Sequence, residues 1–190
     1  GQEGNYYLIV RLNSLPVGAV PYMASGNYNY TSSNVRNAIE LWYDNVNTGT
    51  NTGVSTGTLE GLKSFAVRSD ADVAVGQYGN VTAPISKPNA TTGYAYPFAL
   101  SYQEGAKYMC VEWHNGTGFS KAGMGQYANS NWNVFEGSVS SENATWLRSV
   151  GMVASDGAWL HHVKGQLGRS PVTAPNYIHP AMWVKAEIFD

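Results

Sequence analysis

Short segments in which apolar and polar residues alternate recur along the chain, and they limit its fold more than any other feature. In the stretch 5–13 (NYYLIVRLN), Leu8, Val10 and Leu12 alternate with Tyr7 and Arg11. Successive side chains of a strand point to opposite faces, so a period of two predicts a half-buried β-strand. The same alternation is found in 62–69, 71–78 and 181–190.

The connections between these segments are rich in turn-forming residues. The stretches 44–58 and 79–93 consist largely of Gly, Asn, Thr and Ser, and Pro84 and Pro88 have no backbone donor for a strand ladder. Many short strands separated in this way predict a mainly β fold, an antiparallel β-sandwich with one or two short flanking helices. The length of 190 residues suits a single domain over 1–190.

Two stretches interrupt the strand pattern with helical spacing. In 32–43, Ser32 or Ser33 can cap a helix whose apolar residues are Val35, Ala38, Ile39 and Trp42; a strand over 38–45 is the alternative. In 140–152, Ser140 or Ser141 can cap, and Gly151 can terminate, a helix with one apolar face. That face would hold Trp146, Leu147 and Val150.

Composition excludes several classes of protein. Only 13% of the residues are charged, the formal net charge is −2, and Lys and Arg do not cluster, which argues against a nucleic-acid binder. The single cysteine, Cys110, lies among apolar residues and is read as a buried thiol, so a disulfide framework is excluded. No apolar stretch reaches the about 18 residues of a membrane-spanning helix.

The setting of the protein is predicted from its glycosylation motifs. Five Asn-x-Ser/Thr motifs weakly favour an extracellular location. They begin at Asn29, Asn80, Asn89, Asn115 and Asn143. No basic-then-apolar signal segment opens the chain. We therefore expect the mature form of a secreted, soluble protein.

Catalytic chemistry has little support in the sequence. The adjacent His161 and His162 would point to opposite faces of a strand, and Asp70 and Asp72 lack the ligand run of a calcium loop, so both pairs are interpreted as surface groups. No nucleophile, zinc or phosphate-loop motif occurs. We expect no enzyme activity, no cofactor and no metal, although a carboxylate pair assembled only in three dimensions is left open.

Large rings gather in a glycine-rich stretch, 113–135. The rings are Trp113, Phe119, Tyr127, Trp132 and Phe135. Rings on a loop can stack on sugar faces or lie at the headgroup level of a bilayer; alternatively, some of them fold inward as core. Trp132, between Asn131 and Asn133, is the ring expected to stay outside.

The second half of the chain, 94–190, resembles the actinoporin-like superfamily, which includes sea-anemone cytolysins and fungal fruit-body lectins. The stretch 127–134 (YANSNWNV) is similar to the Tyr-Ser-Asn-Trp-Trp-Asn-Val signature of the cytolysins, with one Trp missing. The matching residues are Ser130, Asn131, Trp132, Asn133 and Val134. A strand pair over 96–114 precedes the signature, 155–170 is similar to an Asp-x-Gly-Trp segment, and 179–190 stands where the family ends in an apolar strand.

The resemblance implies a β-sandwich flanked by two helices and a lipid-headgroup site. Phe119, Tyr127 and Trp132 would be its loop contacts and Trp146 its helix contact, with rings that attract a choline group by about 0.5–2 kcal/mol each. It implies a secreted membrane-binding protein of the pore-forming cytolysin type that can form homo-oligomers on membranes. The predicted ligand-binding residues are Trp113, Phe119, Tyr127, Asn129, Asn131, Trp132, Asn133 and Trp146.

Two other functions stay open. In a glycan-binding lectin of the same fold, Trp132 or Tyr127 would stack on sugar, and the amides of Asn129, Asn131 and Asn133 would bind hydroxyls. A viral or bacterial receptor-binding adhesin head with a jelly-roll fold is the third. Pro16 and Pro21 disfavour an N-terminal pore helix, and a helix over 35–43 would be about 14 Å long against the ~30 Å of hydrocarbon. We expect residues 1–34 to be mobile or to add a strand.

Overall fold

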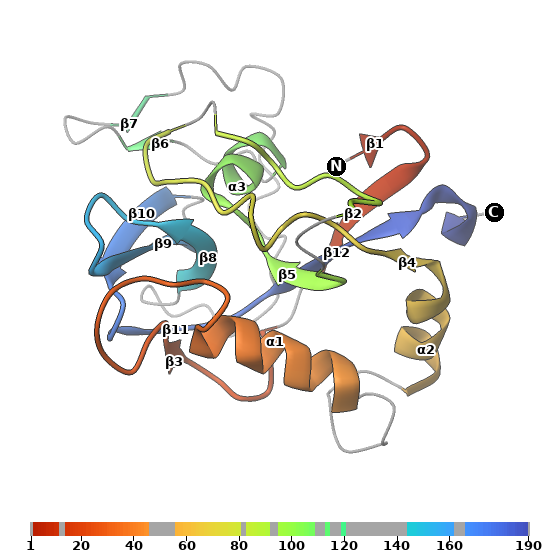
Figure 1. The fold of residues 1–190 in the computed structure, drawn as a ribbon, viewed down its shortest axis with the longest axis horizontal. Coiled ribbons are helices and arrows are strands. Elements are labelled where there is room, and N and C mark those ends of the chain that lie inside the picture. The colour runs from red at the N-terminus through yellow and green to blue at the C-terminus, as the bar shows by residue number, and fades with distance from the viewer. Residues whose placement is uncertain are drawn as a thin grey trace.

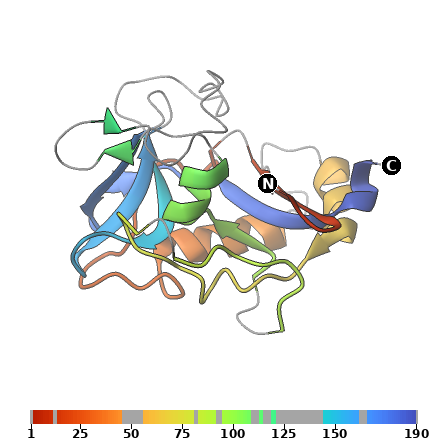
Figure 2. The same cartoon turned by 90° about the horizontal axis from the view of Figure 1, so that it is seen from above.

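The computed structural model of the chain shows a β-rich fold with several antiparallel sheets and few helices (Figure 1). It describes residues 2–11, 14–45, 56–80, 83–91, 95–108, 113–114, 119–120, 144–161 and 166–189. Two sheets of three or more strands lie at different ends of the long axis (Figure 2).

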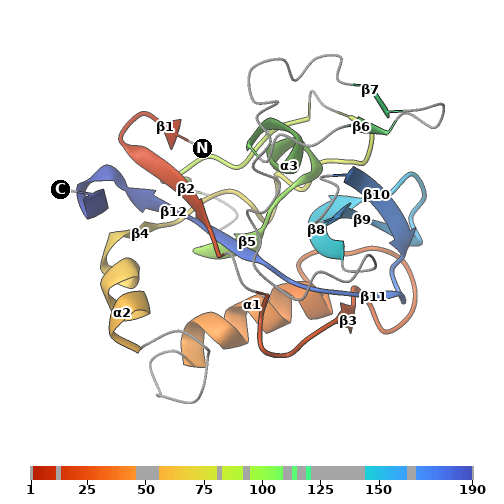
Figure 3. The ribbon, with the colours of Figure 1, turned by 180° about the vertical axis from the view of Figure 1, so that it is seen from behind.

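The larger sheet joins the beginning and the end of the described chain. Its strand order is β1 (Gln2–Glu3), β2 (Tyr6–Val10), β12 (Pro180–Lys185) and β4 (Ala66–Val67), and β5 (Pro97–Ala99) also pairs with β12. Strands β2 and β12 are antiparallel, with Val10 opposite Ala181 and Tyr6 opposite Lys185. Strand β12 therefore runs through the middle of the molecule (Figure 3). These two strands confirm the strand predictions for 5–13 and for the first half of 181–190.

The smaller sheet has the order β10 (Gln166–Pro171), β9 (Asp156–His161) and β8 (Ala144–Val150). The register places Gly168 opposite Trp159. A Cβ atom on Gly168 would lie 2.2 Å from the Trp159 ring, so only glycine fits there. Two further pairs of short strands are β3 (Val20–Pro21) with β11 (Pro175–Asn176), and β6 (Trp113–His114) with β7 (Phe119–Ser120).

Helix α1 (Asn34–Asn45) forms where the sequence predicts it, and the strand alternative over 38–45 is wrong. The Ser33 hydroxyl oxygen accepts a hydrogen bond from the Arg36 backbone N–H at 2.9 Å, which caps the first turn. Val35 and Ile39 are fully buried, and the helix packs against β5. The other helices are α2 (Thr56–Phe65), α3 (Tyr102–Tyr108) and the 3-10 helix η3 (Ala186–Phe189).

The predicted helix over 140–152 is wrong for its described residues, because Ala144–Val150 form strand β8. Six of its seven residues are buried. A strand that is covered on both faces loses the polar–apolar alternation, and a short apolar run of this kind cannot be distinguished from a buried helix by its spacing.

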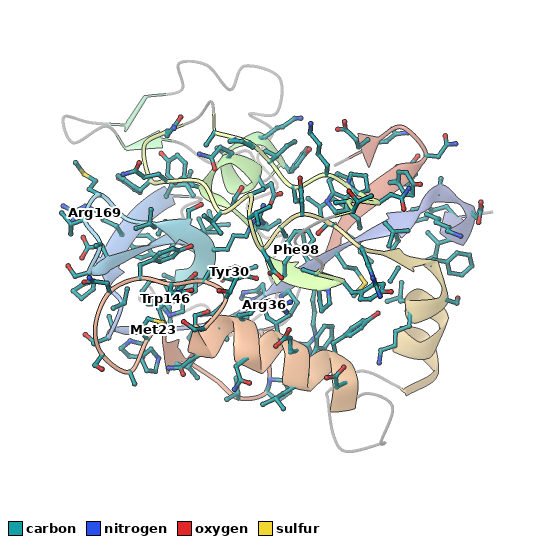
Figure 4. All side chains as sticks on the ribbon, viewed as in Figure 1. Met23, Tyr30, Arg36, Phe98, Trp146 and Arg169 are labelled. Atoms are coloured by element: carbon teal, nitrogen blue, oxygen red, sulfur yellow. The ribbon has the colours of Figure 1, made fainter. Side chains whose placement is uncertain are left out.

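Trp146 is correspondingly not an exposed helix contact but a core residue, with 0% of its surface accessible (Figure 4). Its indole N–H donates to the Val20 carbonyl at 2.8 Å, and its ring meets the Tyr22 ring edge-on at 5.2 Å. A Cβ atom on Gly157 would lie 2.9 Å from the indole, so this glycine makes room for the ring. The expectation that Trp146 meets a lipid headgroup is therefore wrong.

Three other strand predictions are corrected. Residues 62–65 belong to helix α2, and only Ala66–Val67 is strand. The stretch 71–78 forms turns with a single bridge from Gln77 to Val150. The predicted strand pair over 96–114 contains helix α3 instead, whose first five residues are buried. In 71–78 the buried residues Ala71 and Ala74 are three apart, so the alternation of valines does not describe a sheet face.

The two aspartates that were expected to be solvated surface charges have partners. Asp72 forms an ion pair with Arg36, with 3.0 Å between Nε and Oδ1, and both side chains are mostly buried. Asp70 accepts a hydrogen bond from the backbone N–H of Lys87 at 2.6 Å. Both carboxylates therefore hold chain segments together.

Replacing Trp146 by Ala tests whether this ring is core. We expect Trp146→Ala to lower the free energy of unfolding by about 3–5 kcal/mol, because it leaves a cavity beside Tyr22 and Gly157. Urea unfolding followed by far-UV circular dichroism measures the change. Met152→Ala, at a side chain that is 61% exposed, is the control and should change the stability by less than about 0.5 kcal/mol. Equal midpoints for the two variants would contradict the burial of Trp146.

Candidate functional site

The segment that holds most of the predicted binding residues starts and ends at two elements of the core. Residues 109–143 connect helix α3 to strand β8, which pack against each other. Residues 102–106 of α3 and 144–149 of β8 are buried. The segment therefore leaves from and returns to two largely buried elements that contact each other.

A fully buried ion pair joins these two elements. The guanidinium of Arg148 on β8 donates to both carboxylate oxygens of Glu104 on α3, at 2.6 and 2.8 Å, and neither side chain has accessible surface. Such two-point geometry is the strongest form of an Arg–carboxylate pair. The pair, here called the clamp, therefore holds together the two elements between which residues 109–143 lie.

Backbone groups complete the hydrogen bonding of both charges. The backbone N–H groups of Ser86 and Ser101 donate to the Glu104 carboxylate at 2.8 and 2.9 Å. Arg148 donates in turn to the carbonyl oxygens of Ala74 and Ala99 at 3.0 and 2.7 Å. A buried pair stabilises a fold only when its remaining donors and acceptors are satisfied in this way.

Hydroxyl groups extend the network to other elements. The Ser86 hydroxyl donates to Glu104 and accepts a hydrogen bond from the indole N–H of Trp183 on β12 at 2.9 Å. The Ser149 hydroxyl oxygen accepts from the Tyr102 backbone N–H at 2.8 Å. The clamp is thus connected to the central strand of the larger sheet.

The electrostatics keep both members of the pair charged. Burial by itself would raise the pKa of Glu104, but the charge of Arg148 and hydrogen bonds from Arg148, Ser86 and Ser101 outweigh it and hold this pKa below its ordinary value. Burial would likewise lower the pKa of Arg148, but the Glu104 carboxylate outweighs it and raises this pKa. Glu104 is therefore a structural carboxylate rather than a proton donor.

Three of the predicted binding residues lie in the described parts of the chain. Trp113 and Phe119 lie in β6 and β7, where Trp113 pairs with Ser120 and Phe119 with His114, and β6 lies beside β10. Trp146 is buried in β8, against Val20 and Tyr22. Tyr127, Asn129, Asn131, Trp132 and Asn133 lie outside the described residues, as do Cys110 and His162.

Neither a metal centre nor a membrane-spanning helix is found in the described parts of the chain. Among them, no group of three or more His, Cys, Asp or Glu side chains is arranged to hold a metal ion. No helix in the same ranges has the length and apolar character needed to cross a bilayer.

Sequence reasoning missed a cluster of rings and cations on the surface at the end of α1. The rings of Tyr43 and Tyr96 stack at 5.9 Å with an interplanar angle of 16°. The Lys63 ammonium lies 4.3 Å from the Tyr43 ring centroid, and the Arg68 guanidinium lies 5.5 Å from that of Tyr96. The four residues, here called the tyrosine–cation cluster, come from distant parts of the chain, so only a folded structure reveals them.

No protein-family model, no curated protein and no solved structure matches this chain. The chemistry of its own residues therefore carries the functional proposal.

Removal of one partner of the clamp should destabilise the protein strongly. We expect Glu104→Gln to lower the free energy of unfolding by about 3–5 kcal/mol, because it leaves the Arg148 charge buried without a counter-charge. The double change Glu104→Leu with Arg148→Met should cost less than the sum of the two single changes. Urea unfolding of the four proteins gives the coupling energy, and simple additivity would contradict a clamp.

The clamp also predicts a dependence on pH. Because the folded-state pKa of Glu104 lies below the ordinary 4.5, its stabilisation is complete above that value and is lost as pH falls through the folded-state pKa. Unfolding of the wild type and of Glu104→Gln between pH 2 and 7 should therefore converge at low pH. Glu40→Gln is the control, since this carboxylate is exposed beside Arg36 and should contribute less than about 1 kcal/mol. A constant gap between wild type and Glu104→Gln across the range would contradict the prediction.

Proposed function

We propose that the chain is a glycan-binding recognition module whose binding residues lie in the 109–143 segment. The observation that carries this proposal is the Glu104–Arg148 clamp, which joins the two elements from which the segment leaves and to which it returns. A fixed base is compatible with a recognition role for residues 109–143, because the elements on either side of them are held by interactions of their own.

The composition of the segment supports binding rather than catalysis. It combines Tyr, Trp, Asn, Ser and Gly, which recognition loops use because rigid rings supply contact area and small polar residues supply adaptable hydrogen bonds. Trp132 would stack on the apolar face of a sugar, and the amides of Asn131 and Asn133 would bind its hydroxyl groups. The segment carries three glutamates and one lysine, so its weakly acidic character disfavours an anionic ligand and is compatible with an uncharged saccharide.

Binding to membranes of the cytolysin type has less support. The ring of Trp146, which that site would need, is buried, and residues 6–10 pair with β1 and β12 in the larger sheet. A lipid-headgroup site of that type therefore lacks the contact that the ring of Trp146 would supply. The sandwich arrangement, membership in the actinoporin-like superfamily, secretion and the adhesin alternative stay predictions.

A glycan array probed with the wild type and with Trp132→Ala tests the proposal. We expect binding to a defined set of glycans that falls about five- to thirtyfold in Trp132→Ala, because loss of one stacking ring removes about 1–2 kcal/mol. Met152→Ala, which changes an exposed side chain on the turn between β8 and β9, is the control and should bind like the wild type.

Two results would overturn the proposal. One is the absence of any glycan bound above background by the wild type. The other is ring-dependent binding to phosphatidylcholine or sphingomyelin vesicles, lost in Trp132→Ala, without glycan binding. Thermal unfolding of Trp132→Ala should match that of the wild type, so that a loss of binding is not a loss of fold.

A further inference from the structure

Trp159 lies on β9, the middle strand of the smaller sheet. In the register of this sheet it stands opposite Trp146 of β8 on one side and opposite Gly168 of β10 on the other. Residues that stand directly opposite each other in an antiparallel pair lie on the same face. The two tryptophans and Gly168 therefore share one face of the sheet.

The two tryptophans on this face are covered to different extents. The ring of Trp146 has no accessible surface, because Tyr22 packs edge-on against it and the Val20 carbonyl of β3 binds its N–H. Trp159 also packs against the core, but it is partly exposed. The cover of this face is therefore complete over Trp146 and incomplete over Trp159.

A glycine allows the ring of Trp159 to lie across β10. A Cβ atom on Gly168 would lie 2.2, 2.4 and 2.7 Å from the Cζ2, Cη2 and Cε2 atoms of the indole. The ring occupies the space that a side chain at position 168 would fill, so it reaches from β9 over the backbone of β10. Gly168 is itself partly exposed and has no side chain that could cover the ring.

The strand under this ring is the neighbour of the 109–143 segment. Strand β10 is at the edge of the smaller sheet, and β6, in the first part of the segment, lies beside it. Figure 3 shows β6 and β7 on the same side of the molecule as β10. The indole of a core strand therefore lies across the strand that is next to the proposed binding segment.

These features fit a saccharide as ligand. A large ring that is held against a strand offers contact area at a low cost in conformational entropy, and an indole combines an apolar surface with a polar N–H. We propose that Trp159 is the fixed stacking surface of the glycan site, on which one ring of an uncharged saccharide lies, while residues of 109–143 contact the same saccharide. This inference rests on the proposed function and names the part of that site which the core supplies.

Titration calorimetry tests the stacking surface with the uncharged oligosaccharide that gives the strongest array signal, added as the free sugar. We expect Trp159→Leu, which keeps an apolar side chain but removes the ring, to weaken binding about fivefold or more. Trp159→Phe keeps a smaller ring and should weaken binding by a smaller factor. Tyr7→Leu is the matched control and should bind like the wild type, because Tyr7 is also a partly exposed ring packed against the core but lies on β2 of the larger sheet.

A measurement on the intact side chain separates contact with the sugar from packing, and it decides the matter if Trp159→Leu does not fold. With fluorotryptophan in place of the six tryptophans, each ring gives its own fluorine resonance, and Trp159→Phe assigns that of Trp159. We expect the same free sugar to shift the Trp159 resonance and to leave that of the buried Trp146 in place. A purely structural Trp159 would give no shift.

Two results would overturn the stacking surface while the proposed function stands. One is equal affinity of Trp159→Leu and Tyr7→Leu for a sugar that the wild type binds. The other is a Trp159 resonance that does not move when this sugar binds. The absence of any bound glycan on the array would instead remove the proposed function, and the stacking surface with it.

Discussion

The buried pair of Glu104 and Arg148 is the interaction on which the rest of the structure depends. Removing two charges from water costs several kcal/mol per ion, and a protein recovers this only with close geometry and complete hydrogen bonding. Here the carboxylate has backbone donors from Ser86 and Ser101, and the guanidinium has backbone acceptors. These partners lie in three stretches, at Ala74, at Ser86 and at 99–101, so the pair holds these stretches together with helix α3 and strand β8.

The position of the pair would separate stability from the proposed recognition role. Its two members lie a few residues outside the two ends of 109–143, one on α3 and one on β8. Loop closure costs little more for a long segment than for a short one, so a clamp at the base permits a long insertion. The sequence within the insertion can then be rich in Asn, Gly and aromatic residues, a composition that suits the proposed binding role better than it suits a core.

Some elements can be predicted from the sequence because the local residue pattern and the packing of the whole fold favour the same structure. Helix α1 has a capping serine and one apolar face, and strand β2 has the alternation of a half-buried strand. Strand β8 was missed because it is covered on both faces, so Trp146 and Val150 gave helical spacing by coincidence. Arg148 lies in the middle of this buried strand, and a charge in that position is compatible with burial only together with its partner. That partner, Glu104, is 44 residues away, and no local pattern connects them.

The low content of charged residues explains why local sequence patterns do not reveal the proposed binding residues either. With 13% charged residues, the chain uses several of its charges in defined pairs or over rings, as in Arg148 with Glu104, Arg36 with Asp72 and Lys63 with Tyr43. A lysine over a tyrosine has no sequence signature, because its partner need not be near in the chain. The segment 109–143 is rich in rings and slightly acidic, whereas the tyrosine–cation cluster places a cation over each of two rings. Each of them can be altered by substitution without changing the two residues of the clamp.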